Sequence, residues 1–425
     1  MNIEIGNALA PTAIPGVSRE SLERLDDEVS RAHERIETGI EAGRPGYKAL
    51  DLGDTVDPAT ITETVEPIPA NGPVIVVGMG GSALGARAMA RALAPEREWY
   101  VLDTIDPTKL VRQLDEIDLS QAVCHVVSHS GNTVETRVTF EVIRSAMEDA
   151  GIEWRDRTVA TTTAESPLGE LVEAADIPRF DPPSGVPGRY SVLSEMALPS
   201  AAMLGIDIEG LLEGARSVRA ELTPSLFETP AYAYGATMAA LSSRGVSQNA
   251  FIPYAEDLDG VAHWFGQLWA ESLGKDGIGQ TPIAGRGIAD HHAHLQRWRA
   301  GPRDLVVTTL SVDHPTSLTV SPGADLGEVD LTTLHELERK AAEASLVIDG
   351  RPVVRLELEA LDAYNLGALF VSLEAACMLY GELRAINPFD QPAVEWAKQA
   401  VRDVLSGYDT HRTRALDDEP ILHIS

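Results

Sequence analysis

Short apolar runs alternate with helix-forming segments through the first half of the chain, and this alternation limits the fold more than any other feature. Four of these runs predict buried strands at residues 74–77, 99–102, 122–128 and 158–162. The helices predicted after them cover residues 82–93, 107–114, 133–149 and 167–174. Strands and helices at this spacing form a parallel sheet covered on both faces, and its ligands bind beyond the carboxyl ends of the strands.

The alternation returns in the second half of the chain, after a rigid turn at residues 185–191 and a helical region at 193–245. The strands of this second set are predicted at residues 248–254, 279–283, 305–310 and 353–358. Its helices are predicted at residues 260–273, 290–298, 334–344, 364–383 and 392–405. A further amphipathic helix, capped by Ser18, is predicted at residues 18–42.

These elements together predict an α/β fold with two doubly wound parallel sheets, each an αβα sandwich, and helical extensions at both ends. The expected division is an N-terminal helical extension at residues 1–48, a first domain at 49–205 and a second domain with the C-terminal helices at 206–425.

The chain is strongly acidic: 34 Lys and Arg residues against 65 Asp and Glu residues give a net charge of −31. A surface of this kind excludes nucleic acid and anionic membranes as expected partners. Only five residues are lysine, and lysine depletion together with acid enrichment indicates a high-salt cytoplasm. At roughly molar salt the screening length falls to about 3 Å, so self-repulsion is tolerated. An ordinary acidic protein is the alternative.

Targeting and redox signals are absent from the sequence. The N-terminus has neither a basic patch nor an apolar signal core, and the longest apolar stretch, residues 366–380, contains Glu374 and is too short to span a bilayer. A cytoplasmic protein is therefore expected.

Cys124 and Cys377 lie in apolar runs and predict buried free thiols, and no zinc-binding spacing occurs.

A glycine-rich turn follows the first predicted strand. Gly78, Gly80 and Gly81 lead into Ser82, so backbone N–H groups converge at the start of a helix and form an anion site, most often a phosphate site. The alternative is a relaxed dinucleotide fingerprint, with Asp103 as the ribose-binding acid.

A second polar loop follows the third predicted strand. Residues 128–133 read Ser-His-Ser-Gly-Asn-Thr and place small donor side chains at a strand end and a helix start. Simple capping of the next helix would need one of these residues. The loop therefore predicts, together with Ser82, a grip for the phosphate of a small metabolite.

These and four later segments resemble the glucose-6-phosphate isomerase (phosphoglucose isomerase) family, whose members are built from two sugar isomerase domains. The matching motifs occur in the family's order at residues 77–85, 128–136, 188–193, 267–275, 292–296 and 389–398. The resemblance implies reversible isomerisation of glucose 6-phosphate and fructose 6-phosphate through an enediol, with no metal and no redox cofactor.

The resemblance also implies the catalytic roles. Glu271 would be the base that moves a proton between C2 and C1, and its largely apolar helix would raise a carboxylate pKa by burial. Arg189 would stabilise the enediolate oxygen. His292 would open the sugar ring, assisted by Lys398, because the pKa of an imidazole is near neutral. A solvated Glu271 beside Lys275 and a structural salt bridge of Arg189 are the alternatives.

The substrate-binding residues follow from the same resemblance. They are the phosphate-binding Gly81, Ser82, Ser128, Ser130 and Thr133, and the polar Gln267 and Gln391. The family supplies its histidine across a two-fold interface, so a homodimer sharing His292 is expected.

Two departures from the family pattern fall in the second loop, where His129 and Asn132 replace a usual lysine and threonine. They bear on phosphate affinity and leave the reacting groups in place.

Three other interpretations stay open at this stage. Asp290, His291, His292 and His294 could bind a metal, but adjacent histidines on a helix point in different directions, so the four cannot converge from this run alone. A relative that also accepts mannose 6-phosphate would carry the same motifs. A non-catalytic sugar-phosphate-binding protein would need neither Glu271 nor His292.

Overall fold

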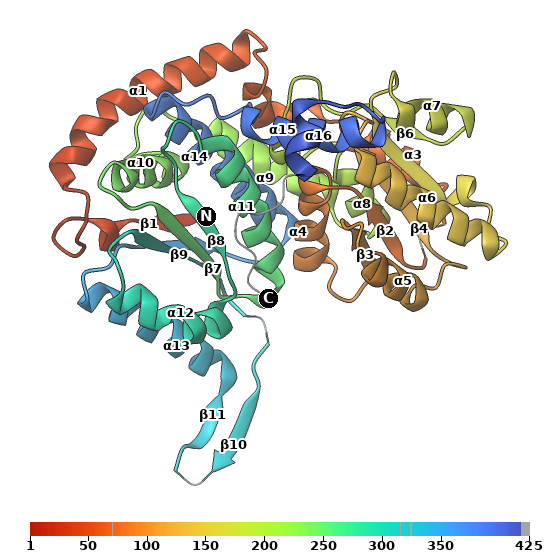
Figure 1. The fold of residues 1–425 in the computed structure, drawn as a ribbon. Helices are drawn as coiled ribbons and strands as arrows, with labels where there is room; N and C mark the ends of the chain where they lie inside the picture. The colour runs from red at the N-terminus through yellow and green to blue at the C-terminus, as the bar shows by residue number, and fades with distance from the viewer. Residues whose placement is uncertain (70, 315, 324, 418–425) are drawn as a thin grey trace. The chain divides into compact units, whose positions relative to one another are not determined.

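The computed structural model describes residues 1–69, 71–314, 316–323 and 325–417 (Figure 1). Contacts within the chain divide it into two compact units, Met1–Pro388 and Phe389–Ser425. The first unit contains two five-stranded sheets, and the described part of the second unit contains two helices.

The first sheet is fully parallel, with strand order β3-β2-β4-β5-β6. Its strands are β2 (Val74–Val77), β3 (Trp99–Leu102), β4 (Val123–Ser128), β5 (Thr158–Thr162) and β6 (Arg179–Phe180). The helices α4 (Leu84–Leu93), α5 (Pro107–Glu116), α6 (Val134–Asp149) and α7 (Pro167–Ala174) alternate with the strands. The predicted parallel α/β architecture is confirmed, and β6 is an additional strand.

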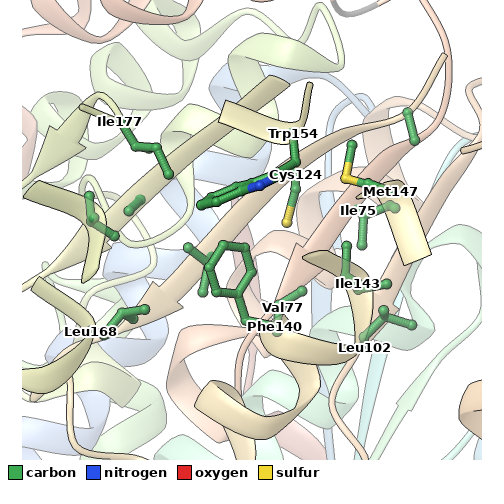
Figure 2. Packing of buried hydrophobic residues seen from close by; sticks show 14 of the residues in the cluster. Ile75, Val77, Leu102, Cys124, Phe140, Ile143, Met147, Trp154, Leu168 and Ile177 are labelled. Carbon is green, nitrogen blue, oxygen red and sulfur yellow. The ribbon is translucent and has the colours of Figure 1, made fainter. Parts of the chain in front are cut away.

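Aliphatic and aromatic side chains fill the space between this sheet and its helices (Figure 2). Val77 and Cys124 from the strands meet Phe140 of α6, which packs edge-to-face on Trp154 with ring centroids 5.9 Å apart. Burial on both faces explains why β2 and β4 read as unbroken apolar runs. Both cysteines are buried and free, as predicted.

The second sheet is mixed, with strand order β1-β12-β9-β7-β8. The strands β7 (Gln248–Pro253), β8 (Thr281–Ala284), β9 (Leu305–Val312) and β12 (Val353–Leu358) are parallel. The edge strand β1 (Asn2–Glu4) is antiparallel and pairs Ile3 with Leu356. The all-parallel prediction is therefore corrected at this edge, because three residues are too few to show a strand pattern.

Helices surround the second sheet. They include α10 (Pro230–Ser242), α11 (Asp259–Leu273), α12 (Gly287–Ala300) and α13 (Leu331–Ile348), which contact its strands. The helix α14 (Ala363–Leu383) packs against α1 (Arg19–Glu41), α9 (Ile208–Ala220), α10 and α11. The helix α8 (Leu198–Met203) instead packs against α4 and β2 of the first sheet. The Ser18 side chain caps α1 by accepting from the Ser21 amide at 3.0 Å, as predicted. The region at 193–245 is three helices, interrupted at Gly205, whose φ is +78°, and restarted at Pro230.

Residues 49–72 are not the simple polar approach that the sequence indicated. Their described part contains the end of the 3₁₀ helix η2 (Tyr47–Asp51) and the helices α2 (Leu52–Thr55) and α3 (Pro58–Val65). The antiparallel hairpin β10 (Thr319–Gly323) and β11 (Gly327–Asp330) also lay outside the prediction. It lies between β9 and α13 in the chain and extends away from the second sheet (Figure 1).

The helix α14 is long and apolar enough, by length and composition, to cross a membrane. Yet 89% of its most apolar window is buried inside the protein, where it packs against α9, α10 and α11. Burial raises the pKa of its Glu374 well above the usual range. A core helix accounts for these observations.

The second unit contains α15 (Pro392–Leu405) and α16 (His411–Asp417). Asp403 on α15 accepts hydrogen bonds from Thr410 at 2.8 Å and Arg412 at 2.9 Å, which join the two helices.

Candidate functional site

The glycine turn after β2 is tighter than the sequence indicated. Residues Gly80–Ser82 form the 3₁₀ helix η3, with φ +54° at Gly80, and the Ala83 amide donates to the Gly80 carbonyl at 2.9 Å. The α-helix therefore begins at Leu84, not at the predicted Ser82. The turn keeps its backbone amides at the carboxyl end of a buried strand, where an anion site was expected.

The absence of side chains lets this turn approach two later segments. A Cβ on Gly81 would lie 2.4 Å from the Gly188 carbonyl carbon and 2.7 Å from the Arg189 nitrogen. A Cβ on Gly80 would lie 2.8 Å from the side-chain nitrogen of Gln267. The glycines thus bring the turn against the Arg189 segment and against α11.

The helices that follow the turn and carry Glu271 also pack together. A Cβ on Gly260 of α11 would lie 2.9 Å from the Ala88 Cα of α4. Close backbone contact of this kind fixes α11 relative to the turn.

The second loop joins the end of β4 to the start of α6. Ser128 Oγ donates to Thr133 Oγ1 at 3.3 Å, and the Asn132 amide donates to Ser130 Oγ at 3.3 Å. Gly131 has φ +62°, and a Cβ there would collide with Ser166. Thr133 precedes α6, but among the described residues its side chain accepts no hydrogen bond from the helix backbone. Capping therefore does not account for its hydroxyl.

His129 ties the second loop to the segment that leads to Arg189. Its Nε2 lies 3.1 Å from the Val186 carbonyl and donates to it, since a carbonyl can only accept. Thr163 Oγ1 donates to the His129 carbonyl at 2.8 Å. The residue that replaces a usual lysine thus holds the loop by hydrogen bonds.

Arg189 is buried, with 2% of its surface exposed, in the 3₁₀ helix η5 (Gly188–Tyr190). Its Nε donates to Ser272 Oγ at 2.8 Å, and Nη2 donates to the Pro388 carbonyl at 2.6 Å. Its Nη1 lies 3.4 Å from Glu271 Oε2. A guanidinium held on these sides cannot easily reorient.

Glu271 and Gln267 lie one turn apart on α11. Gln267 Nε2 donates to Glu271 Oε1 at 3.1 Å, so each carboxylate oxygen has a partner. The Glu271 side chain is 32% exposed, so its burial is less complete than expected. The ammonium of Lys275 donates to the Asn387 carbonyl. Arg189 therefore does form a salt bridge, as one alternative expected, and its partner is Glu271.

A carboxylate with a fixed cation beside it and anion-binding backbone nearby can move a proton next to a developing oxyanion. The structure brings together Gly81, Arg189, Gln267 and Glu271 through the contacts above, and His129 links the second loop to the same segment.

The contacts above do not include three of the expected residues. His292 is exposed on α12, and no hydrogen bond or ion pair of the described residues joins it to Glu271 or Arg189. Gln391 directly precedes α15 in the second unit. Lys398 lies on α15, where its Nζ is 3.3 Å from Glu395 Oε1.

Sequence reasoning missed Ser272, the buried acceptor of the Arg189 Nε hydrogen bond. The one signal in the sequence that could have identified Ser272 is its position directly after Glu271. The next residue after Arg189, Tyr190, donates from its hydroxyl to Cys377 Sγ at 3.2 Å and joins η5 to α14.

The histidine run on α12 does not gather four ligands. Asp290 accepts from the Arg286 amide at 2.5 Å, and the His294 ring stacks on Trp298 with centroids 5.7 Å apart. Among the described residues, one group of three possible metal ligands occurs, His291, His292 and Glu338.

The family model and two relatives similar in sequence carry names of the same isomerase. A family described as phosphoglucose isomerase matches residues 68–283. A probable glucose-6-phosphate isomerase of Natronomonas pharaonis is 49% identical over 430 residues, covering 100% of both chains. The corresponding protein of Haloquadratum walsbyi is 46% identical, also over 100% of both chains.

Solved structures share the fold. A hypothetical protein from Thermus thermophilus superposes with a TM-score of 0.85 at 28% identity, covering 96% of this chain and 100% of that one. A glucose-6-phosphate isomerase from Chlamydia trachomatis gives a TM-score of 0.82 at 20% identity, covering 94% and 89%.

Proposed function

The chain belongs to the phosphoglucose isomerase family, and we propose from this premise how its residues interconvert D-glucose 6-phosphate and D-fructose 6-phosphate. The reaction is an aldose–ketose isomerisation of glycolysis and gluconeogenesis. The observation that carries the mechanism is the Glu271 carboxylate, held between Gln267 at 3.1 Å and Arg189 at 3.4 Å.

Glu271 acts as the base. It takes the proton from C2 of the open-chain aldose, which leaves an enediolate with its charge on O1. The hydroxyl proton passes from O2 to O1 through the enediol, and Glu271 returns its proton to C1 to give the ketose. The one-third exposure of its side chain leaves one side of the carboxylate accessible to a substrate. Gln267 orients the carboxylate by donating to the other oxygen.

Arg189 stabilises the enediolate oxygen. Its guanidinium is buried and fixed by Ser272 and Pro388, so it needs no reorganisation when negative charge develops. An interaction that is stronger in the transition state than in the ground state raises kcat.

The two loops hold the phosphate. Ser82, Ser128, Ser130 and Thr133 supply hydroxyl donors, and the Gly81 turn supplies backbone amides. We assign Gln391 to the sugar phosphate only from its match to the family motif at residues 389–398. A phosphate anchored in this way positions C1 and C2 for one carboxylate.

Ring opening needs a proton donor and acceptor at the ring oxygen and at the C1 hydroxyl. We assign this step to His292, assisted by Lys398, with His292 supplied by the partner in a homodimer. The exposure of His292 on α12 supports a role outside its own site. Exposed leucines on the neighbouring α13, Leu334 and Leu337, support an interface at this face.

The enzyme works in the cytoplasm at high salt. Its net charge of −31 and its 46–49% identity to proteins of halophilic archaea support this setting.

The test is a coupled isomerase assay in concentrated salt with EDTA present. Fructose 6-phosphate should form from glucose 6-phosphate at an undiminished rate, since no step uses a metal. Loss of activity in EDTA, or no conversion at all, would contradict the proposal. A parallel assay with mannose 6-phosphate measures substrate range, and a nicotinamide cofactor titration should show no binding.

A further inference from the structure

Two parallel helices beside the second sheet bring three metal-binding side chains together. His291 and His292 lie on α12, and Glu338 lies on α13, which packs against α12. One ligand atom from each lies within 4.8 Å of the other two. A second helix thus supplies the donor that the histidine run could not supply by itself.

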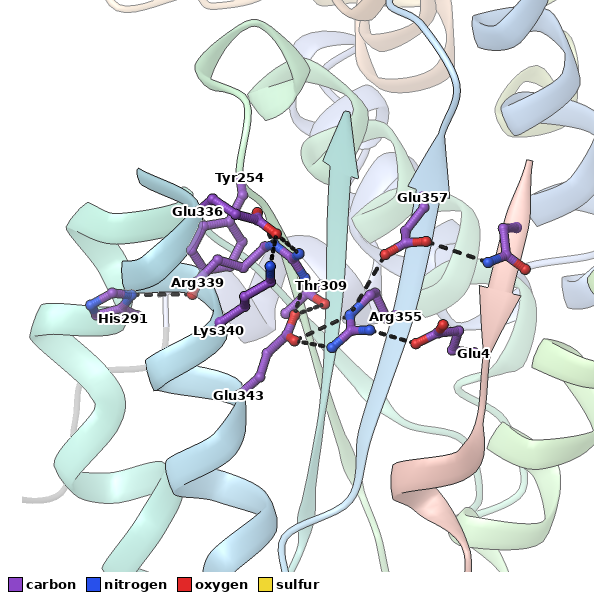
Figure 3. Close-up of polar contacts among 11 residues, drawn as sticks. Glu4, Tyr254, His291, Thr309, Glu336, Arg339, Lys340, Glu343, Arg355 and Glu357 are labelled. Atoms are coloured by element: carbon purple, nitrogen blue, oxygen red, sulfur yellow. Dashed lines mark hydrogen bonds and ion pairs between the residues drawn. The ribbon is translucent and has the colours of Figure 1, made fainter. Parts of the chain in front are cut away.

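Among these three residues, His291 has the most fixed side chain, because it is buried with 3% of its surface exposed. Its Nδ1 lies 3.1 Å from the Tyr254 hydroxyl (Figure 3), and its Nε2 lies 3.7 Å from Glu338 Oε2. A hydrogen bond to one ring nitrogen fixes which nitrogen is left for a metal. Nε2, facing the carboxylate, is therefore the ligand atom of this residue.

The other two donors can move. His292 is exposed, with its ring centroid 4.5 Å from that of His291, and the Glu338 side chain is 37% exposed. Ligand atoms around a tetrahedral ion with bonds near 2.1 Å lie about 3.4 Å apart. The pair of His291 and Glu338 is already close to that separation, and rotation of the exposed His292 side chain can bring in the third donor.

The charges around the site leave these donors available. Among the described residues no Lys or Arg pairs with Glu338. The adjacent Arg339 is occupied by Glu336 at 2.7 Å and Glu343 at 2.9 Å (Figure 3).

We propose that His291, His292 and Glu338 bind a late first-row divalent ion such as Zn²⁺, and that this ion inhibits the enzyme. Two imidazoles and one carboxylate are donors that suit such ions and leave positions for water. Coordination uses the ring lone pair with which His292 would accept a proton. The inhibitory part rests on the proposed ring-opening role of His292, whereas the binding part does not.

Binding is tested by titrating Co²⁺, a coloured substitute for Zn²⁺, into the full chain in concentrated potassium nitrate. Four- or five-coordinate Co²⁺ with nitrogen ligands absorbs visible light more strongly than six-coordinate Co²⁺ on surface carboxylates. We expect one saturable ion per chain. His291→Gln and Glu338→Gln should weaken this binding by about tenfold or more. His294→Gln is the matched control, because His294 stacks on Trp298 outside the group, and it should bind normally.

No saturable absorption in the wild type, or equal weakening by His294→Gln, would overturn the site. Glu338→Gln keeps the test decisive if the buried His291→Gln variant fails to fold. In the isomerase assay, Zn²⁺ should inhibit the wild type and His294→Gln at concentrations that spare Glu338→Gln, and EDTA should reverse the inhibition. Binding without inhibition would overturn the inhibitory claim. An inactive metal-free enzyme would instead contradict the proposed function.

Discussion

At the scale of residues, the surroundings of Arg189 show how a buried cation is kept in one orientation. Its Nε points to Ser272, its Nη2 to the Pro388 carbonyl and its Nη1 to Glu271. Ser272 acts on the proposed site through its hydrogen bond to Arg189, so we treat it as a positioning residue.

Removing the Ser272 hydroxyl tests this role. In Ser272→Ala, an N–H of Arg189 loses its buried acceptor, an effect of about 1–3 kcal/mol, and kcat should fall by about 10- to 100-fold with a smaller change in KM. Ser194→Ala is the control, because it removes another buried hydroxyl, one that donates to the Ser191 carbonyl at 2.7 Å. Equal kcat for the two variants would refute a positioning role.

A second buried group, His125, links stability to pH. Its ring nitrogens lie 2.6 Å from Ser200 Oγ and 2.8 Å from Thr161 Oγ1, and burial lowers its pKa to about 3 from the usual 6.5. The unfolded chain therefore binds a proton below about pH 6.5 that the folded chain does not. Stability is lost as the pH falls through this window.

We expect the free energy of unfolding to decrease by up to about 1.4 kcal/mol per pH unit below about pH 6.5 from His125 alone. His125→Gln should be less stable than the wild type at neutral pH and should show a shallower decline. Urea unfolding at several pH values in constant salt measures both slopes. An unchanged slope in the variant would contradict the assignment.

Residues that belong to a local motif, such as Ser128 or Glu271, could be proposed for the site from the sequence. It could not predict contacts between distant segments. Ser272 meets a residue 83 positions earlier, and His129 meets a carbonyl 57 positions later. Such contacts depend on how the two sheets and α11 pack, which periodicity does not encode.

At the scale of elements, buried parallel strands were predicted well because burial on both faces gives continuous apolar runs. The strands β1, β6 and the hairpin β10–β11 were not predicted. β1 and β6 have three and two residues, and β10 is exposed along its length, so none has an apolar pattern. The start of α4 was misplaced because a glycine turn can continue as a 3₁₀ helix.

The face formed by α13 and the hairpin exposes leucines that an isolated subunit would leave in water. Leu334 and Leu337 are 41% and 57% exposed, and Leu318 beside the hairpin is 56% exposed. In an acidic chain, such a face is typical of an interface.

Replacing both Leu334 and Leu337 by Asp should keep the proposed homodimer from forming, because two charges would be buried at its proposed interface. Isomerase activity should fall with dimer content, since each site would lose the partner's His292. Sedimentation measures the mass. Val111→Asp, on an exposed apolar residue of α5, is the control and should remain dimeric. A fully active monomer would contradict the shared-site proposal.

At the scale of the whole molecule, repulsion between like charges opposes folding. With a net charge of −31, folding brings like charges closer than in the unfolded chain. Salt screens this repulsion over distances longer than the Debye length, which falls from about 10 Å at about 0.1 M to about 3 Å at about 1 M.

The melting temperature and the isomerase activity should therefore both rise between about 0.1 M and about 4 M potassium chloride. Thermal unfolding and initial rates across this range provide the measurement. Full stability and activity at the lowest salt would show that the acidic surface is not a high-salt adaptation.

The proposed isomerisation depends on the carboxylate of Glu271 as the base. The most direct test is Glu271→Gln, which keeps the shape of the side chain and removes its ability to accept a proton. We predict that kcat falls by several orders of magnitude, roughly 10³-fold or more, while calorimetry still shows fructose 6-phosphate binding. Turnover near the wild-type rate in this variant would contradict the role of Glu271 as the base.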